Sequence, residues 1–242
     1  MTRRRFIADT FSPATGHPTH ASLTGDQATH LARVLRAQPG QIFDLVANGF
    51  LHRAEITSVS ETEVAFILLE ELDADAALPL TLLLAVFKFD HMEWAIEKAT
   101  ELGVATITPI LARRTEKHLT LAAPRRAERW RRIALEAAKQ SRRSDIPTIT
   151  DPIPLKLALT QQTSPTRILL SETEQHQTIS AVLTLRSVSE LALAIGPEGG
   201  WTPEEMTLFT QHEWQHVTLG PRILRAETAA IAAIAIASTH LT

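Results

Sequence analysis

Two glycine-containing loops between residues 191 and 237 constrain the fold of this chain more than any other feature. Each loop follows an apolar run and leads into a helical pattern: Gly196–Gly200 in the first unit and Gly220–Arg222 in the second. Thr202 is predicted to be an N-cap, with Glu205 as the acid of a capping box. Because glycine has no Cβ, such loops let backbone N–H groups approach a ligand closely. We therefore expect two strand–loop–helix units and a small-molecule site at one sheet edge.

Apolar strands and helical patterns alternate from residue 80 onward. Leu80–Phe87 is a continuous apolar run of the kind buried in parallel sheets, and the helical pattern Asp90–Leu102 follows it. A strand is expected at Ala105–Leu111 and a long amphipathic helix at Pro124–Gln140. Further strands are expected at Arg167–Leu170, Leu191–Ile195 and Trp214–Leu219. This alternation predicts an α/β domain with a mainly parallel sheet.

The first 72 residues have a different pattern, with short β-rich runs at 41–49, 50–59 and 62–72. Asn48-Gly49 lies between two of these runs and predicts a hairpin. One helical pattern interrupts them at Thr24–Leu35, with Leu31, Val34 and Leu35 on one face. The segment is expected to form a small barrel or a partly open sheet.

An acidic, aperiodic stretch at Leu72–Ala77 separates these two patterns. Such composition is typical of a linker between domains. We expect one domain at residues 1–73 and a second at residues 74–242.

The composition excludes several classes of protein. Cysteine is absent from the 242 residues, which excludes disulfides and thiolate metal sites. The longest apolar stretch, Leu78–Phe87, is far too short to span a bilayer. No apolar signal core follows the basic N-terminus. A soluble protein of the cytoplasm is expected, without a membrane partner.

Cations are concentrated in two places although the net charge is −3. Eleven lysines and arginines lie between Arg113 and Arg143, against three glutamates, and a smaller group lies at Arg3, Arg4 and Arg5. One such cluster alone is more often a solvated helix face. Two clusters in a slightly acidic chain favour a local surface for a polyanion such as nucleic acid.

His212–His216 reads HEWQH and matches the H-E-x-x-H pattern of zinc proteases. The pattern binds zinc only on a helix, where residues four apart share one face. Here it runs directly into the predicted strand, in which the two histidines would lie roughly 13 Å apart. We interpret the match as accidental and expect no metal.

The segment after the second loop combines a cation, an acid and an apolar helix. Arg225 lies between the loop and the helix, and Glu227 is placed to interact with the helix dipole. Ala229–Ala237 consists of alanine and isoleucine on all sides. Such a helix is expected to be buried, against another element or another subunit.

Several motifs together resemble one family, the 16S ribosomal RNA (uracil-N3)-methyltransferases of the SPOUT or trefoil-knot superfamily. The motifs are RRRF near the start, HLARVLR at His30–Arg36, IEKATELGVATITPI at Ile96–Ile110, AAKQSRRSDIP at Ala137–Pro147, IGPEGGWTPEE and LGPRILRAETA. The resemblance covers most of the chain, and the last two motifs are specific. It implies a PUA-like β-barrel followed by a knotted α/β domain that binds S-adenosylmethionine and forms a homodimer.

The resemblance also implies the reaction, methyl transfer to N3 of one uridine in 16S ribosomal RNA within the small ribosomal subunit. Arg225 is then placed to stabilise the uracil anion. The residues leave the base open between Glu198, Glu227 and bulk water. The residues expected to bind the cofactor are Leu170, Ser171, Glu172, Ile195, Gly196, Pro197, Glu198, Gly199, Gly200, Leu219, Gly220, Pro221, Ile223, Leu224, Arg225, Thr228 and Ala229.

Cations of the first domain, with three cations from the second, are expected to contact RNA phosphates. Such contacts fix the position of the protein on the RNA but do not read the base sequence. The expected set is Arg3, Arg4, Arg5, His30, Arg33, Arg36, Lys88, Arg142 and Arg143. The chain departs from the family at Thr29, where a histidine is common, and at Phe89, where a glycine is common.

Two other functions fit the sequence less well. A knotted methyltransferase acting on transfer RNA or on a ribose hydroxyl is disfavoured by the RRRF motif and the N-terminal barrel. A non-catalytic RNA-binding assembly factor is disfavoured by the intact glycine loops and Arg225.

Overall fold

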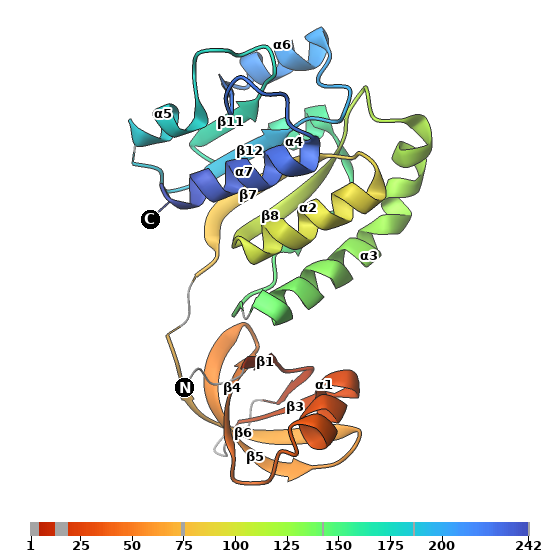
Figure 1. Ribbon diagram of the computed structural model, residues 1–242, viewed down its shortest axis with the longest axis vertical. Coiled ribbons are helices and arrows are strands. Elements are labelled where there is room, and N and C mark those ends of the chain that lie inside the picture. The colour runs from red at the N-terminus through yellow and green to blue at the C-terminus, as the bar shows by residue number, and fades with distance from the viewer. Residues whose placement is uncertain (1–4, 13–18, 74–75, 142, 186, 242) are drawn as a thin grey trace. The chain divides into compact units, whose positions relative to one another are not determined.

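Two sheets, each with its own apolar core, organise the chain (Figure 1). The computed structural model describes residues 5–12, 19–73, 76–141, 143–185 and 187–241. Residues Met1–Ala76 and Ala138–Asp145 form one compact unit, and Ala77–Ala137 and Ile146–Thr242 form the other.

The sheet of the first unit is mainly antiparallel. Its six strands are ordered β1-β4-β5-β6-β3-β2, and only the β1–β4 pair is parallel. Asn48 and Gly49 have φ of 52° and 83° and connect β4 to β5, which confirms the predicted hairpin. The strands are β1 (Arg5–Ile7), β2 (Thr10–Ser12), β3 (His20–Thr24), β4 (Ile42–Ala47), β5 (Phe50–Val59) and β6 (Glu63–Glu71).

The helix of this unit changes its geometry halfway. An α-helical turn, α1 (Gly25–Thr29), continues as a π-helical turn at His30–Val34, where the Leu35 N–H donates to the carbonyl of His30 at 3.0 Å. The wider turn rotates the following side chains away from α-helical positions. Leu31 is fully buried, but Val34 is 66% exposed, so the prediction that Val34 shares its face was wrong.

The sheet of the second unit is parallel throughout, as the buried apolar runs predict. Its strands are ordered β10-β8-β7-β12-β11-β13, with β9 also pairing with β8. The five residues of β12 are all buried at the centre of the sheet. The strands are β7 (Leu78–Ala85), β8 (Val104–Leu111), β9 (Thr148–Ile149), β10 (Ile153–Pro154), β11 (Thr166–Leu170), β12 (Leu191–Ile195) and β13 (Gln215–Val217).

Helices cover both faces of this sheet because side chains alternate along each strand. Leu82 and Leu84 pack on one face with Ile96 and Trp130, whereas Leu83 packs on the other face with α4 and α6. Figure 1 shows α7 beside α2, and the two helices are in contact. The helices are α2 (Phe89–Glu101), α3 (Lys117–Ser141), α4 (Leu155–Gln161), α5 (Ile179–Thr184), α6 (Pro203–Gln211) and α7 (Ala226–Ser238).

Helix α3 begins at Lys117 and not at Pro124, where the sequence predicted its start. A proline inside a helix removes one hydrogen bond, here the one to the carbonyl of Thr120. Leu119 and Ala123 are buried in the core, and their packing stabilises the turns before the proline. Although α3 has 25 residues, neither it nor any other helix in the described part of the chain is long and apolar enough to cross a membrane.

Candidate functional site

Loops from several parallel strands meet at the carboxyl edge of the second sheet. Such an edge is the usual position of ligand sites in open α/β sheets. Strand β12 pairs with β11 through Ala194 and Leu169, and β11 pairs with β13 through Leu170 and Val217. The structure therefore brings together the three predicted cofactor segments, Leu170–Glu172, Ile195–Gly200 and Leu219–Arg225.

The first glycine loop is a tight turn over an aromatic ring. The Gly200 N–H donates to the carbonyl of Pro197 at 2.8 Å, and Gly200 has a φ of 69°. The Trp201 indole packs against Gly196, where an added Cβ would lie 3.0 Å from the indole Nε1. Trp201 is buried, and its Nε1 has no hydrogen-bond partner within the described residues. The loop thus holds one buried polar donor without a partner.

The capping box that follows this loop is confirmed and also anchors a neighbouring loop. The Thr202 side chain accepts from the Glu205 N–H at 3.2 Å, and Glu205 accepts from the Thr202 N–H at 2.9 Å. The second Glu205 oxygen accepts from the Arg113 N–H at 2.8 Å. Glu205 therefore connects the start of α6 to the loop after β8.

Arg114 is a site residue that the sequence pattern did not single out. Its guanidinium donates to the carbonyl of Gly199 at 2.7 Å. A Cβ added to Gly200 would lie 2.8 Å from Oε1 of Glu172. The loops after β8, β11 and β12 are thereby held against one another. In the sequence, Arg114 is one of the cations between Arg113 and Arg143. Its position just after a predicted strand could have indicated a place at the same sheet edge as the glycine loops.

Donors and cations at the start of α6 stabilise the charged form of Glu204. The pKa of Glu204 lies below its ordinary value, first because its own backbone N–H donates to the carboxylate and then because of the Thr202 hydroxyl. Arg113 and Arg114 lower this pKa further through their charge.

The second glycine loop is tied to the strand before it, and its far end is exposed. The Thr218 hydroxyl accepts from the Gly220 N–H at 3.2 Å, and Gly220 has a φ of 117°. Ile223 is 86% exposed. Arg225 is the exposed N-cap residue of α7, so its guanidinium is accessible to a substrate.

The start of α2 lies beside the first glycine loop and the start of α7. Lys88, the residue before α2, has its Nζ 4.0 Å from Oε1 of Glu198 in the first loop. His91 has its Nδ1 3.4 Å from Oε1 of Glu227, at the start of α7. The two predicted bases differ in environment, because Glu198 is exposed and Glu227 is 3% exposed.

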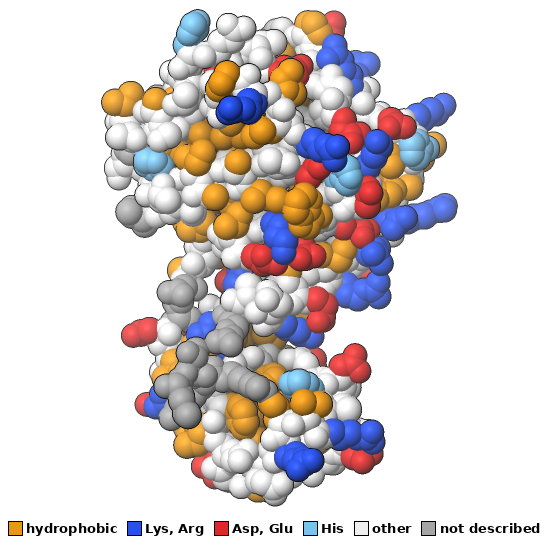
Figure 2. Space-filling model, in the orientation of Figure 1, with side chains coloured by type: hydrophobic (Ala, Val, Ile, Leu, Met, Phe, Trp, Pro, Cys, Tyr) orange, Lys and Arg blue, Asp and Glu red, His pale blue; other side chains and the backbone are white. Residues whose placement is uncertain are grey.

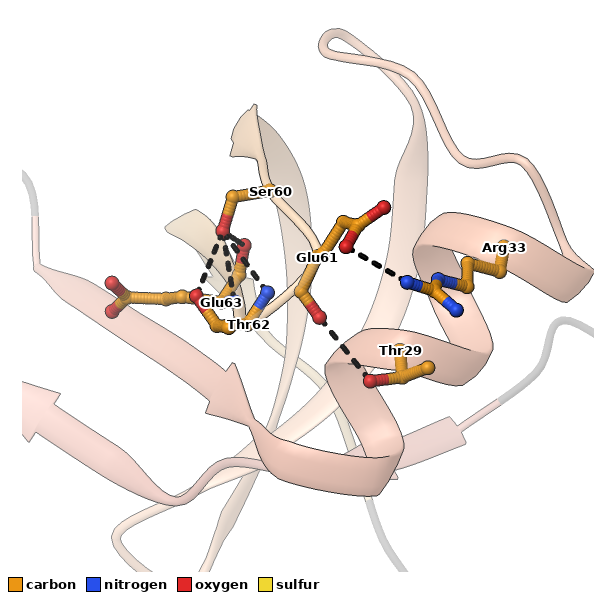
Figure 3. A network of polar contacts seen from close by, with 6 residues as sticks. All are labelled: Thr29, Arg33, Ser60, Glu61, Thr62 and Glu63. Carbon is orange, nitrogen blue, oxygen red and sulfur yellow. Dashed lines mark hydrogen bonds and ion pairs between the residues drawn. The ribbon is translucent and has the colours of Figure 1, made fainter.

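Two of the arginines predicted to contact RNA are engaged in ion pairs. Figure 3 shows Arg33 pointing to Glu61, in the turn between β5 and β6. One guanidinium nitrogen of Arg33 lies 2.8 Å from Oε2 of Glu61, and 63% of the Arg33 side chain remains exposed. Thr29 donates to the carbonyl of Glu61 at 3.2 Å in the same network. Arg143 is paired with Asp145, and only 8% of its side chain is exposed.

The remaining members of the predicted RNA set are distributed between the two units. Arg5 lies in β1, and His30 and Arg36 are exposed near the π-helical turn. Lys88 lies beside the first glycine loop. Arg3, Arg4 and Arg142 lie outside the described residues.

The HEWQH motif does not lie on one helix. His212 is the C-cap residue of α6, Glu213 has a φ of 59°, and His216 lies in β13. The prediction that the motif runs from a helix end into a strand is confirmed. In the described parts of the chain, no group of three or more His, Cys, Asp or Glu side chains is placed to hold a metal ion.

Comparison with known sequences identifies both units. An RNA methyltransferase domain model matches residues 74–238, and an RNA methyltransferase PUA domain model matches residues 23–69. Ribosomal RNA small subunit methyltransferase E of Bacillus subtilis is 34% identical over 98% of this chain and 96% of its own length. The protein of the same name from Synechocystis is 34% identical over 88% of this chain and 71% of its own length.

Solved structures are similar along almost the whole chain. Ribosomal RNA small subunit methyltransferase E of Neisseria gonorrhoeae, bound to S-adenosyl methionine, has a TM-score of 0.83 and 29% identity, covering 99% of this chain and 98% of its own. A methyltransferase of Legionella pneumophila, solved with bound cofactor SAM, has a TM-score of 0.81 and 26% identity over the same shares.

Proposed function

This chain belongs to the ribosomal RNA small subunit methyltransferase E family, and we propose that it methylates N3 of one uridine in 16S ribosomal RNA. S-adenosylmethionine supplies an activated methyl group on its sulfonium sulfur. One observation carries the proposal: the loops after β11, β12 and β13 meet at one sheet edge, and an exposed Arg225 lies beside them.

The residues at this edge fit S-adenosylmethionine. Gly199 and Gly200 present backbone without a Cβ, and the Trp201 Nε1 is a buried donor that lacks a partner in the described structure. We propose that the cofactor is held by the segments Leu170–Glu172, Ile195–Gly200 and Leu219–Arg225, with Thr228 and Ala229 of α7. Backbone donors and acceptors of the glycine loops would bind its polar groups.

Arg225 supplies the charge that the reaction needs. The N3 atom of uracil is a poor nucleophile until its proton is removed, and the resulting negative charge spreads to the two ring oxygens. A fixed guanidinium beside those oxygens stabilises the developing anion. Because the side chain of Arg225 is exposed, it is free to contact a base presented by RNA.

The first unit supplies phosphate contacts. Arg5, Arg33 and Arg36 are among its cationic residues, and His30 lies beside them in the sequence. Arg3 and Arg4 extend this set in the sequence. We propose that these side chains hold the small ribosomal subunit, in the cytoplasm, without reading base sequence.

Helix α7 supports a homodimer. Its inner side packs against α2, whereas Ile231, Ala232, Ala235 and Ile236 remain partly or fully exposed. Figure 2 shows apolar side chains gathered on the face where α7 lies in Figure 1. An apolar helix surface of this kind is typical of an interface between subunits. We propose that a second copy of the chain covers it.

Two measurements test the proposed function. Mass mapping of 16S ribosomal RNA, with and without this protein, should locate one N3-methyluridine that depends on it. Methylation of a ribose hydroxyl or of transfer RNA instead would refute the proposal.

Arg225→Ala should bind S-adenosylmethionine as the unchanged protein does, because the backbone of this segment would hold the cofactor and the substitution removes only the side-chain contact with the uracil anion. Loss of such a contact lowers the rate by about 100-fold or more. Single-turnover methylation and calorimetry measure the two quantities. Arg222→Ala, in the same loop, is the matched control: it removes another exposed guanidinium, leaves the loop backbone in place and should keep its activity. Equal turnover in both variants would exclude the role of Arg225.

A further inference from the structure

A buried carboxylate faces a histidine between α2 and α7. Glu227 is 3% exposed, and its Oε1 lies 3.4 Å from Nδ1 of His91. Both Nδ1 of His91 and the second oxygen of Glu227 are buried without a hydrogen-bond partner in the described residues. Burying a carboxylate is costly unless a donor or an opposite charge faces it. Apolar packing of α2 on α7 therefore does not account for this pair.

The pair lies next to the proposed reaction site. Strand β7, which leads into α2, pairs with β12 through Leu84 and Ile195, so the start of α2 follows the same sheet edge as the first glycine loop. Lys88, one helical turn before His91, approaches Glu198 of that loop. Glu227 follows Arg225 by two residues. The start of α2 thus approaches the first glycine loop through Lys88 and the start of α7 through His91.

We propose that His91 is the general base that removes the N3 proton of the uridine, and that Glu227 holds its ring in the competent tautomer. The inference rests on the proposed function. A proton on Nδ1, directed to the carboxylate, leaves the lone pair on Nε2. Nδ1 is buried whereas 30% of the side chain is exposed, so a substrate approaches the ring from the side of Nε2.

The step is balanced in atoms and electrons. The N3–H bond breaks, and its proton forms a bond with Nε2 of His91. The electron pair left on N3 forms the new N–C bond to the methyl group. The sulfonium sulfur keeps the electrons of the broken S–C bond and becomes a neutral thioether. The imidazolium then releases its proton to water, while the Glu227 carboxylate stabilises the transient charge.

Few other charged groups face His91 from the elements around it. Asp90, on the same helix, has Oδ2 3.7 Å from Nε2, but its side chain is 78% exposed and can be displaced by substrate while remaining hydrated. Glu93 is turned to α3, where it accepts from Arg129 at 2.7 Å. Strand β8 contains no charged residue, and α7 contributes only Glu227.

His91→Gln should lower the single-turnover rate of methylation by about 100-fold or more, the usual contribution of a general base. Its affinity for S-adenosylmethionine and its melting temperature should stay near those of the unchanged protein. His118→Gln is the matched control, since His118 also lies 3.4 Å from a carboxylate, that of Glu116, but is 72% exposed. This control should retain full activity.

A more acidic substrate distinguishes a general-base role of His91 from a purely structural role. Subunits reconstituted with 5-fluorouridine in place of uridine carry a more acidic N3–H, so they should recover much of the rate in His91→Gln. A purely structural role predicts the same loss with both substrates, and that result would overturn the inference. If the unchanged protein fails to methylate N3 at all, the proposed function fails instead.

The tautomer of His91 gives a readout that does not depend on activity. In protein with ¹⁵N-labelled histidine at alkaline pH, the ring signal absent from His91→Gln should show a protonated Nδ1 and an unprotonated Nε2. Glu227→Gln should shift this signal. A proton found on Nε2 in the unchanged protein would contradict the proposal, even if the His91 variants prove unstable.

Discussion

At the scale of single residues, the indole ring of Trp201 requires a glycine at position 196. A Cβ at this position would lie 3.0 Å from Nε1 and 3.2 Å from Cε2 of Trp201. The Trp201 ring is buried and packs edge-on against Phe209, with 4.9 Å between the two ring centroids. These contacts restrict its movement away from a new methyl group. Gly196→Ala should lower the free energy of unfolding by about 1–3 kcal/mol and weaken the binding of S-adenosylmethionine. Urea unfolding and calorimetry measure these changes.

The double variant Gly196→Ala, Trp201→Phe identifies the contact responsible. The smaller phenyl ring makes room for the new methyl group, so the double variant should be more stable than the sum of the two single effects predicts. Contacting residues commonly couple in this way. Strict additivity of the two free-energy changes would show that the strain lies elsewhere.

Local patterns predicted the turn and the capping residues of this loop, but not its partners. The capping box joins Thr202 to Glu205, three residues apart, and spacing alone reveals it. Arg114 and Gly199 are 85 positions apart, and His91 and Glu227 are farther apart still. Such pairs depend on which parallel strands become neighbours, and hydrophobic periodicity does not carry that information.

At the scale of elements, α6 is held in place by one buried carboxylate. Glu205 is 3% exposed and accepts from two backbone N–H groups, those of Thr202 and Arg113. Glu205→Ala leaves both donors without a partner and should cost about 2–4 kcal/mol in the free energy of unfolding. Thr202→Ala removes only the cap and should cost about 1 kcal/mol. Chemical denaturation followed by circular dichroism gives both values.

Glu204→Ala is the control for α6, because Glu204 lies in the same turn with an exposed side chain. It should change stability much less than Glu205→Ala. A loss in Glu204→Ala equal to that in Glu205→Ala would mean that the charge near the helix N-terminus, rather than the two hydrogen bonds, anchors the helix.

The elements themselves were largely predictable, and the exceptions have local causes. Leu80–Phe87 and Leu191–Ile195 have the largely apolar composition that buried parallel strands need, and the strands β7 (Leu78–Ala85) and β12 (Leu191–Ile195) are found there. Pro124 suggested a helix start because proline favours the first helical turn. Buried Leu119 and Ala123 extend α3 beyond it. Val34 was misplaced because nothing in a short sequence pattern distinguishes a π-helical turn from an α-helical one.

At the scale of the whole molecule, composition and periodicity predicted a mixed β segment followed by a parallel α/β segment. They did not predict the strand order β10-β8-β7-β12-β11-β13, in which the last strand pairs outside β11. Strand order is set by the packing of helices on both faces of the sheet, which involves residues far apart in the chain. The ligand, the reaction and the second subunit are expectations that come from family resemblance and not from periodicity.

The proposed homodimer can be tested on α7 without disturbing the subunit itself. Ala235 is exposed within one chain, so Ala235→Glu should leave the fold intact. In a dimer through this face, the new carboxylate would be buried without a partner, at a cost of several kcal/mol, and the protein should become monomeric. Sedimentation equilibrium measures the mass.

Thr207→Glu is the control, because Thr207 lies on the exposed side of α6, and it should leave the dimer unchanged. An Ala235→Glu protein that stays dimeric would place the interface elsewhere.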